Sequence, residues 1–154
     1  MRRAKGFFSC GIVCAALVGC SSTFDRDWYH YVPSETDDPL IGRWQGTWKS
    51  YRTEEQGELS CIISRQAKGR YQLRLRLLAR RLWTRKYEYT LEMKVEQSGK
   101  GWKLEGRKDF GWGRGGVVHY RGELKGDDFS CLYSAEEDRG VFELMRYSDD
   151  ASSA

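Results

Sequence analysis

The sequence is poor in the residues that build metal centres and catalytic sites. Its 154 residues include only two histidines, and no group of cysteines and histidines has the spacing of a zinc site. No nucleophile elbow surrounds a serine, and no phosphate-binding Gly-Lys-Ser/Thr ending follows the glycine-rich segment at residues 111–116. We therefore expect no enzymatic activity, no metal site and no cofactor.

Long apolar runs are also missing. Residues 7–18 are apolar or small, which is shorter than the roughly 20 residues that a bilayer-spanning helix needs. Arg2, Arg3 and Lys5 precede this run, and no acid occurs before Asp25. A basic start followed by a short apolar stretch with small residues at its end is typical of a secretory signal.

The signal ends in Leu17-Val18-Gly19-Cys20. This run resembles the bacterial lipobox, which implies a signal peptide over residues 1–19 and a diacylglyceryl group on the Cys20 thiol. Acylation of the new amine would then give the two or three chains that a lasting membrane anchor requires. Ser21, in the next position, implies the outer membrane, facing the periplasm. The alternative is an ordinary cleaved signal beside an incidental cysteine.

The chain has almost no excess of positive or negative charge once the signal is removed. The signal holds three of the 26 bases and none of the 22 acids, so the net charge falls from +4 to about +1. Composition therefore gives no reason to expect nucleic-acid binding. The remaining chain of about 135 residues is long enough for one domain with a modest core.

Three segments divide the processed chain. Residues 20–39 carry both prolines and show no periodicity, which predicts a lipidated tether. Its aromatic group at residues 28–31 is expected to dock on the domain, with the lipid headgroup layer as the alternative. Residues 40–147 form the predicted domain, and residues 148–154 a disordered tail.

Helical patterns are absent from the predicted domain, whereas alternating apolar and polar residues separated by turns are frequent. Short connections indicate antiparallel neighbours, and eight strands that close on themselves leave no sheet edge. We predict an all-β, antiparallel, eight-stranded up-and-down barrel. The expected strands are residues 41–51, 59–66, 70–80, 84–97, 102–110, 117–124, 129–134 and 141–147.

Gly42-Arg43-Trp44 stands at the start of the first predicted strand, and Gly46-Thr47-Trp48 follows on the same face. A Gly-x-Trp in this place resembles the calycin barrels, the lipocalins and avidins. The resemblance implies that Trp44 closes one barrel end beneath Arg146, in a cation–π contact. The wider pattern resembles a set of small bacterial lipoproteins of unknown function. No helix follows the last strand as in lipocalins, so another barrel or a sandwich remains an alternative.

The barrel interior is the first candidate binding site. An eight-stranded barrel is either filled by side chains or wide enough for one small ligand. A filled core predicts a structural or interaction protein of the cell envelope, and a pocket predicts binding of an apolar or amphiphilic molecule. The candidate lining residues are those expected to face inward: Trp48, Leu73, Leu75, Tyr87, Tyr89, Leu91, Trp102, Phe129, Phe142 and Leu144.

Two further features have a functional and a structural interpretation. Arg74 and Arg76 lie in an acid-free basic stretch, where guanidinium groups suit phosphates or acidic glycans. The sequence favours the alternative, a solvated sheet face balanced by acids on neighbouring strands. The glycine-rich segment presents Trp112 either to a membrane or ligand, or simply at a tight turn.

Cys61 and Cys131 form either a disulfide or two separate buried thiols.

Overall fold

The computed structural model describes residues 23–80 and 84–149. The predicted signal peptide, the predicted lipid-attachment residue Cys20 and residues 150–154 lie outside this part of the chain. One short helix, α1 (Thr23–Tyr29), precedes eight strands. These are β1 (Gly42–Ser50), β2 (Gln56–Ala67), β3 (Arg70–Arg80), β4 (Thr84–Ser98), β5 (Gly101–Asp109), β6 (Val117–Lys125), β7 (Asp128–Ser134) and β8 (Arg139–Arg146).

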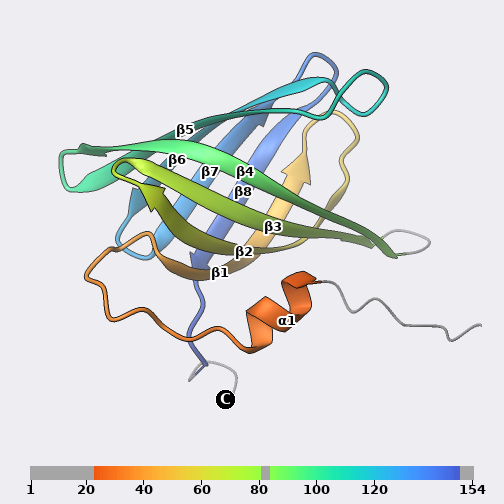
Figure 1. Ribbon diagram of the computed structural model, residues 1–154. Helices are drawn as coiled ribbons and strands as arrows, with labels where there is room; N and C mark the ends of the chain where they lie inside the picture. The colour runs from red at the N-terminus through yellow and green to blue at the C-terminus, as the bar shows by residue number, and fades with distance from the viewer. Residues whose placement is uncertain (1–22, 81–83, 150–154) are drawn as a thin grey trace, which may run out of the picture.

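The eight strands form one closed antiparallel barrel (Figure 1). Each strand pairs with the next in the chain, and β8 pairs with β1 in a register that places Arg146 opposite Trp44. The second glycine of the Gly-x-Trp-x-Gly pattern, Gly46, lies where these two strands meet closely. A Cβ added there would lie 1.9 Å from the carbonyl oxygen of Glu143. The predicted all-β, antiparallel, eight-stranded up-and-down barrel is confirmed.

The barrel wall opens between β4 and β5. These strands pair only from Met93 to Ser98 on β4 and from Gly101 to Gly106 on β5. The first half of β4 continues its pairing with β3 but has no partner on β5, and the two ribbons diverge in Figure 1. This separation widens one end of the barrel.

The opposite end of the barrel is filled. Trp44, Leu59 and Leu104 are completely buried there, and the Trp44 ring meets Phe129 edge-on at 6.0 Å between centroids. The Arg146 guanidinium lies over the Trp44 ring at 4.5 Å, as the resemblance implied. This end is therefore a packed core, and we call it the filled end.

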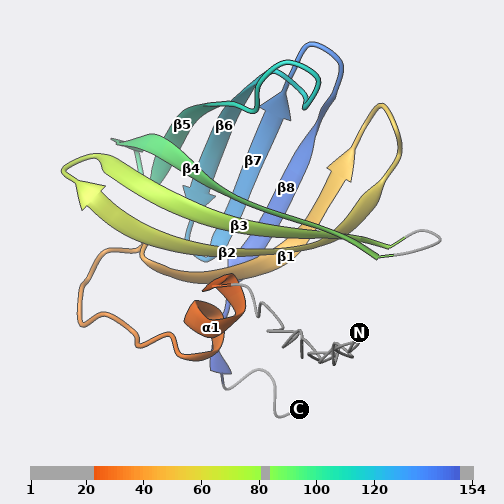
Figure 2. The ribbon, with the colours of Figure 1, turned by 45° about the vertical axis from the view of Figure 1, so that its right-hand side comes forward.

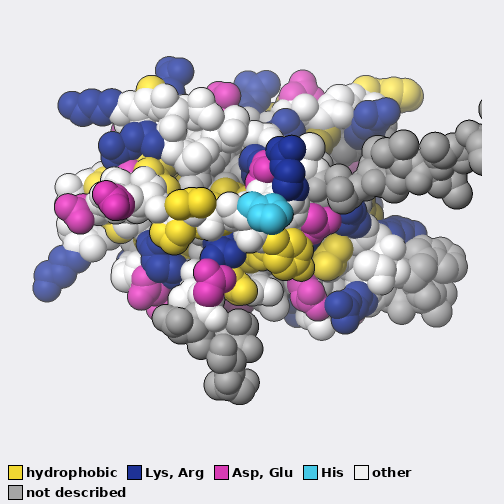
Figure 3. All heavy atoms as spheres, turned by 60° about the horizontal axis from the view of Figure 1, so that its bottom comes forward, with side chains coloured by type: hydrophobic (Ala, Val, Ile, Leu, Met, Phe, Trp, Pro, Cys, Tyr) yellow, Lys and Arg dark blue, Asp and Glu magenta, His cyan; other side chains and the backbone are white. Residues whose placement is uncertain are grey.

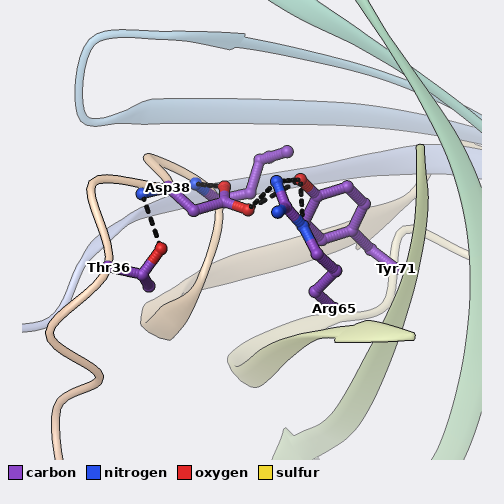
Figure 4. Close-up of polar contacts among 5 residues, drawn as sticks. Thr36, Asp38, Arg65 and Tyr71 are labelled. Atoms are coloured by element: carbon purple, nitrogen blue, oxygen red, sulfur yellow. Dashed lines mark hydrogen bonds and ion pairs between the residues drawn. The ribbon is translucent and has the colours of Figure 1, made fainter. Parts of the chain in front are cut away.

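The segment just before β1 covers the filled end. The Trp44 indole donates a hydrogen bond to the Leu40 carbonyl at 3.0 Å. The Asp38 side chain is only 3% exposed, and its carboxylate accepts hydrogen bonds from the Tyr71 hydroxyl and the Arg65 guanidinium, each at 2.7 Å (Figure 4). Its other oxygen accepts the Leu40 N–H at 3.0 Å. A buried carboxylate with three donors ties this segment to β2 and β3.

The segment predicted as a structureless tether is partly helical. Phe24 and Trp28, one helical turn apart on α1, are buried against Ile62 of β2 and beside Tyr147. Figure 2 shows α1 outside the barrel wall beneath β1 and β2. The prediction of no periodicity in residues 20–39 was wrong, because a helix of two turns buries only two residues and leaves a weak pattern. The expected docking of the aromatic group holds for Trp28, whereas Tyr29 is exposed.

The first residues of the predicted tail are also ordered. Arg43 is buried among the rings of Trp28, Tyr31 and Tyr147, and its guanidinium pairs with the Asp149 carboxylate at 2.7 Å. Cys61 and Cys131 are free, buried thiols, which is the second of the two alternatives considered for them.

Candidate ligand cavity at the open end of the barrel

A cavity of about 640 Å³ occupies the end of the barrel opposite the filled end. It lies where β4 and β5 have separated, between the connections β1–β2, β5–β6 and β7–β8. Its volume is within the range of pockets that hold small molecules. We call this end the open end.

The predicted lining residues divide between the two ends. Trp48, Tyr87, Tyr89 and Phe142 line the cavity. The remaining candidates face inward but do not line it, because they lie in the packed core or towards its end: Leu73, Leu75, Leu91, Trp102, Phe129 and Leu144. Alternation therefore identified which residues face inward, but not where along the barrel axis each residue lies, because that position depends on strand stagger.

Other lining residues were not predicted. Phe110, Val118, Tyr120 and Tyr133 complete the apolar wall, and Leu77 closes it on β3. Tyr120 and Tyr133 share the inward parity of Val118 and Phe129, so the alternation pattern contained the signal for them. Phe110 ends the predicted strand at residues 102–110 and shares the inward parity of Trp102. In the structure it follows β5 and meets the Tyr89 ring edge-on at 5.0 Å between centroids.

A hydrogen-bonded carboxylate fixes one side of the mouth. Asp138, in the connection between β7 and β8, accepts hydrogen bonds from the Ser50 hydroxyl at 2.7 Å and the Tyr133 hydroxyl at 3.1 Å. The Arg52 guanidinium donates to the neighbouring Glu137 carbonyl. Burial and the nearby Asp138 charge raise the pKa of the Tyr133 hydroxyl well above its ordinary value. The β1–β2 and β7–β8 connections are thereby joined.

A pair of phenols bridges the strands deeper in the cavity. The Tyr120 hydroxyl donates to the Tyr89 hydroxyl at 3.2 Å, which links β6 to β4 across the separation from β5. Burial raises the pKa of Tyr120 to about 12 and that of Tyr89 well above its ordinary value. Both groups are therefore uncharged hydrogen-bond donors at neutral pH.

Arg74 and Arg76 do not form an open anion-binding patch. They point outward from β3 as predicted, but their guanidinium groups pair with Asp27 and Asp25 of α1. The Phe24 ring lies under both, with the Arg76 guanidinium 4.8 Å from its centroid. The Arg74 hydrogen bond, ahead of the one from Arg26, lowers the pKa of Asp27. Acids of the helix balance this face together with Glu88 of β4, which lies opposite Arg76, and Figure 3 shows both signs of charge interspersed on it.

The glycine-rich segment forms a tight connection beside the mouth. Gly111, Gly113, Gly115 and Gly116 all have positive φ, which favours glycine. The Trp112 side chain at its tip is fully exposed and contributes nothing to the cavity wall. The need for glycine thus follows from the backbone of this turn.

Comparison with known proteins gives a fold and no family. No family model matches the chain, and no curated protein matches it. A de novo designed fluorescence-activating β-barrel superposes with a TM-score of 0.50 and 12% identity, over 71% of this chain and 94% of that one. Fatty-acid-binding protein 1 of Echinococcus granulosus (TM-score 0.39, 9% identity, 71% and 98%) and a single-site variant of the fluorescent protein UnaG (0.41, 8%, 74% and 100%) are also similar.

These likenesses concern the fold alone. Within residues 23–80 and 84–149, no helix is long and apolar enough to cross a membrane. In the same part of the chain, no three His, Cys, Asp or Glu side chains are grouped to hold a metal ion.

Proposed function

We propose that this protein is a lipid-anchored protein of the bacterial cell envelope whose barrel binds an apolar or amphiphilic small molecule without chemically changing it. The binding site is the cavity at the open end. Cys20 carries the anchor, and the outer membrane, on its periplasmic side, is the proposed location.

The cavity itself is the observation that carries this proposal. A barrel that served only as a scaffold gains stability from complete filling, since voids forfeit packing energy. This barrel instead leaves about 640 Å³ open and surrounds it with aromatic side chains. The cavity exceeds the roughly 300 Å³ at which small-molecule pockets begin. The alternative of a filled structural barrel is supported only at the filled end.

The anchor rests on the lipobox residues and agrees with the position of α1. Two residues, Ser21 and Ser22, lie between Cys20 and the helix start at Thr23, so three Cα–Cα steps join them. An extended chain spans at most about 3.6 Å per residue, so an anchored Cys20 would hold α1 within about 11 Å of its attachment point. The barrel would then rest near the membrane surface rather than on a long tether.

Native mass spectrometry tests ligand binding most directly. The protein is purified from its own cells with the lipid removed, and its mass is compared with that of an Ala135→Trp variant, whose larger side chain enters the cavity mouth. We expect a small molecule on the wild type and none on this variant. Ser98→Trp, at an exposed position at the end of β4 away from the cavity, is the matched control and should retain the molecule. Equal bare masses for all three proteins would contradict the binding proposal.

The anchor has a separate test. Cys20→Ala should move the protein from the membrane fraction to the soluble fraction and should remove the mass of the acyl chains. A protein that keeps its membrane association and mass after this substitution would exclude Cys20 as the attachment site.

A further inference from the structure

The charged residues of the cavity all lie at its mouth. Every lining residue that a strand supplies is uncharged, from Trp48 and Ser50 on β1 to Phe142 on β8. The charged lining residues come from three connections between strands: Arg52, Glu55, Arg114, Glu137 and Asp138. Lys108 of β5 has its ammonium 5.8 Å from the Phe110 ring centroid but does not line the cavity. An ionised group carried to the bottom of the cavity would therefore meet no opposite charge, which makes its burial costly.

The Tyr89–Tyr120 pair has one hydroxyl hydrogen that makes no hydrogen bond within the part of the chain that the structure describes. Tyr89 and Tyr120 together carry two hydroxyl hydrogens, and the bond between them uses one. No other acceptor for either hydroxyl occurs among residues 23–80 and 84–149. Because burial keeps both phenols protonated, one donor remains for an acceptor placed in the cavity.

The walls around this donor are aromatic. The Phe142 ring contacts those of Tyr133 and Tyr120 at 5.2 and 6.1 Å between centroids, and Phe110 contacts Tyr89 at 5.0 Å. Aromatic side chains favour ring-containing partners in offset-stacked or edge-on contact. An aliphatic chain would fill the same space without these contacts.

We infer that the cavity selects an uncharged, ring-containing ligand with a hydrogen-bond acceptor at its buried end, and that the Tyr89–Tyr120 pair donates to this acceptor. This inference rests on the proposed binding function and narrows it. It excludes free carboxylates, sulfonates and phosphates from the buried end of the ligand.

Three fluorescent probes with a common naphthalene core separate the requirements. Phenylnaphthylamine is neutral, anilinonaphthalene sulfonate adds an anion to the same skeleton, and prodan is a neutral naphthyl ketone with a strong acceptor. Each is titrated into the full chain carrying Cys20→Ala, and binding to the Ala135→Trp form of that chain is subtracted as the signal from other sites. We expect both neutral probes to bind at least about tenfold more tightly than the sulfonate, a difference of about 1.4 kcal/mol.

The double variant Tyr89→Phe/Tyr120→Phe tests the donor. It is expected to weaken prodan binding about tenfold and shift the bound emission to shorter wavelength, because the ketone loses its donor. Phenylnaphthylamine affinity should change less than about twofold, since this probe lacks the ketone. Tyr29→Phe, at an exposed position on α1 outside the cavity, is the matched control and should leave the emission unchanged.

Sulfonate binding as tight as that of phenylnaphthylamine would overturn the selection against charge. An unchanged prodan emission in the double variant would overturn the role of the phenol pair. If the double variant does not fold, the ranking of the three probes on the wild type still decides the first point, and Tyr89→Phe and Tyr120→Phe, tested singly, decide the second by the same emission shift. Failure of all three probes to bind would instead contradict the proposed function.

Discussion

The two ends of this barrel are built from the same eight strands but differ in what their inward side chains do. At the filled end, Trp44 is completely buried under Arg146 and against Phe129. Four residues further along the same strand, Trp48 faces a cavity of about 640 Å³. The difference has two structural causes: the segment before β1 covers one end, and β4 leaves β5 at the other. Inward direction alone does not make a residue part of a packed core.

The largest expected effect that tests this contrast is at the filled end. Trp44→Ala should lower the free energy of unfolding by about 3–5 kcal/mol, because it leaves a cavity that the surrounding strands cannot fill. Urea unfolding followed by circular dichroism measures it. Trp112→Ala, at a fully exposed tryptophan, should change stability by less than about 0.5 kcal/mol. A loss below about 1 kcal/mol for Trp44→Ala would contradict its role in closing the barrel.

The tryptophan-to-alanine substitution at the open end should lower the free energy of unfolding by less. Trp48→Ala removes a ring that already borders empty space, so we expect a loss of about 2 kcal/mol, including its indole hydrogen bond to the Leu78 carbonyl at 3.4 Å. The comparison with Trp44→Ala uses identical denaturation conditions. Equal losses for the two variants would mean that the ends are packed alike.

The segment that covers the filled end has its own test. Asp38→Ala removes the acceptor for Arg65, Tyr71 and the Leu40 N–H, and should cost about 1–2 kcal/mol in thermal or urea unfolding. The matched control is Asp37→Ala, an exposed neighbour that should be neutral. Similar behaviour of the two variants would show that this covering segment contributes little to stability.

The smallest expected effect is a pH dependence from the open end. The pKa of Tyr120 is about 12 in the folded protein against an ordinary 10.0, so its stabilising effect is complete below pH 10 and is lost as the pH rises towards 12. Between about pH 9 and pH 11 this one group should cost about 1 kcal/mol of unfolding free energy. The unfolding free energy of Tyr120→Phe should fall by about that much less than that of the wild type over the same range, as measured by urea unfolding at pH 9 and pH 11.

The sequence allowed the barrel and its inward face to be predicted because alternation is a local property. Tyr87, Tyr89, Trp48 and Phe142 were assigned to the interior by parity, and all four line the cavity. Gly42, Trp44 and Arg146 were linked by a resemblance, and the register of β1 with β8 places the latter two side by side.

Other features depend on contacts between distant segments and had no local signal. The separation of β4 from β5 comes from strand stagger, which parity does not report, so Leu73 and Leu75 were assigned to the pocket although they fill the core. The pairing of Arg74 and Arg76 with α1 joins residues about 50 positions apart, so the sequence indicated balancing acids on neighbouring strands but not on the helix.

The closed ring of strands also fixes an order for folding. Seven of the eight strand pairings join neighbours in the chain and need only short loops to close. The eighth, between β1 and β8, brings together Trp44 and Arg146 from opposite ends of the domain, and its loop-closure entropy is the largest. This seam is therefore expected to form last, after the hairpins. Stabilising contacts across this seam, the Trp44–Arg146 pair among them, would therefore slow unfolding and leave the rate of folding largely unchanged.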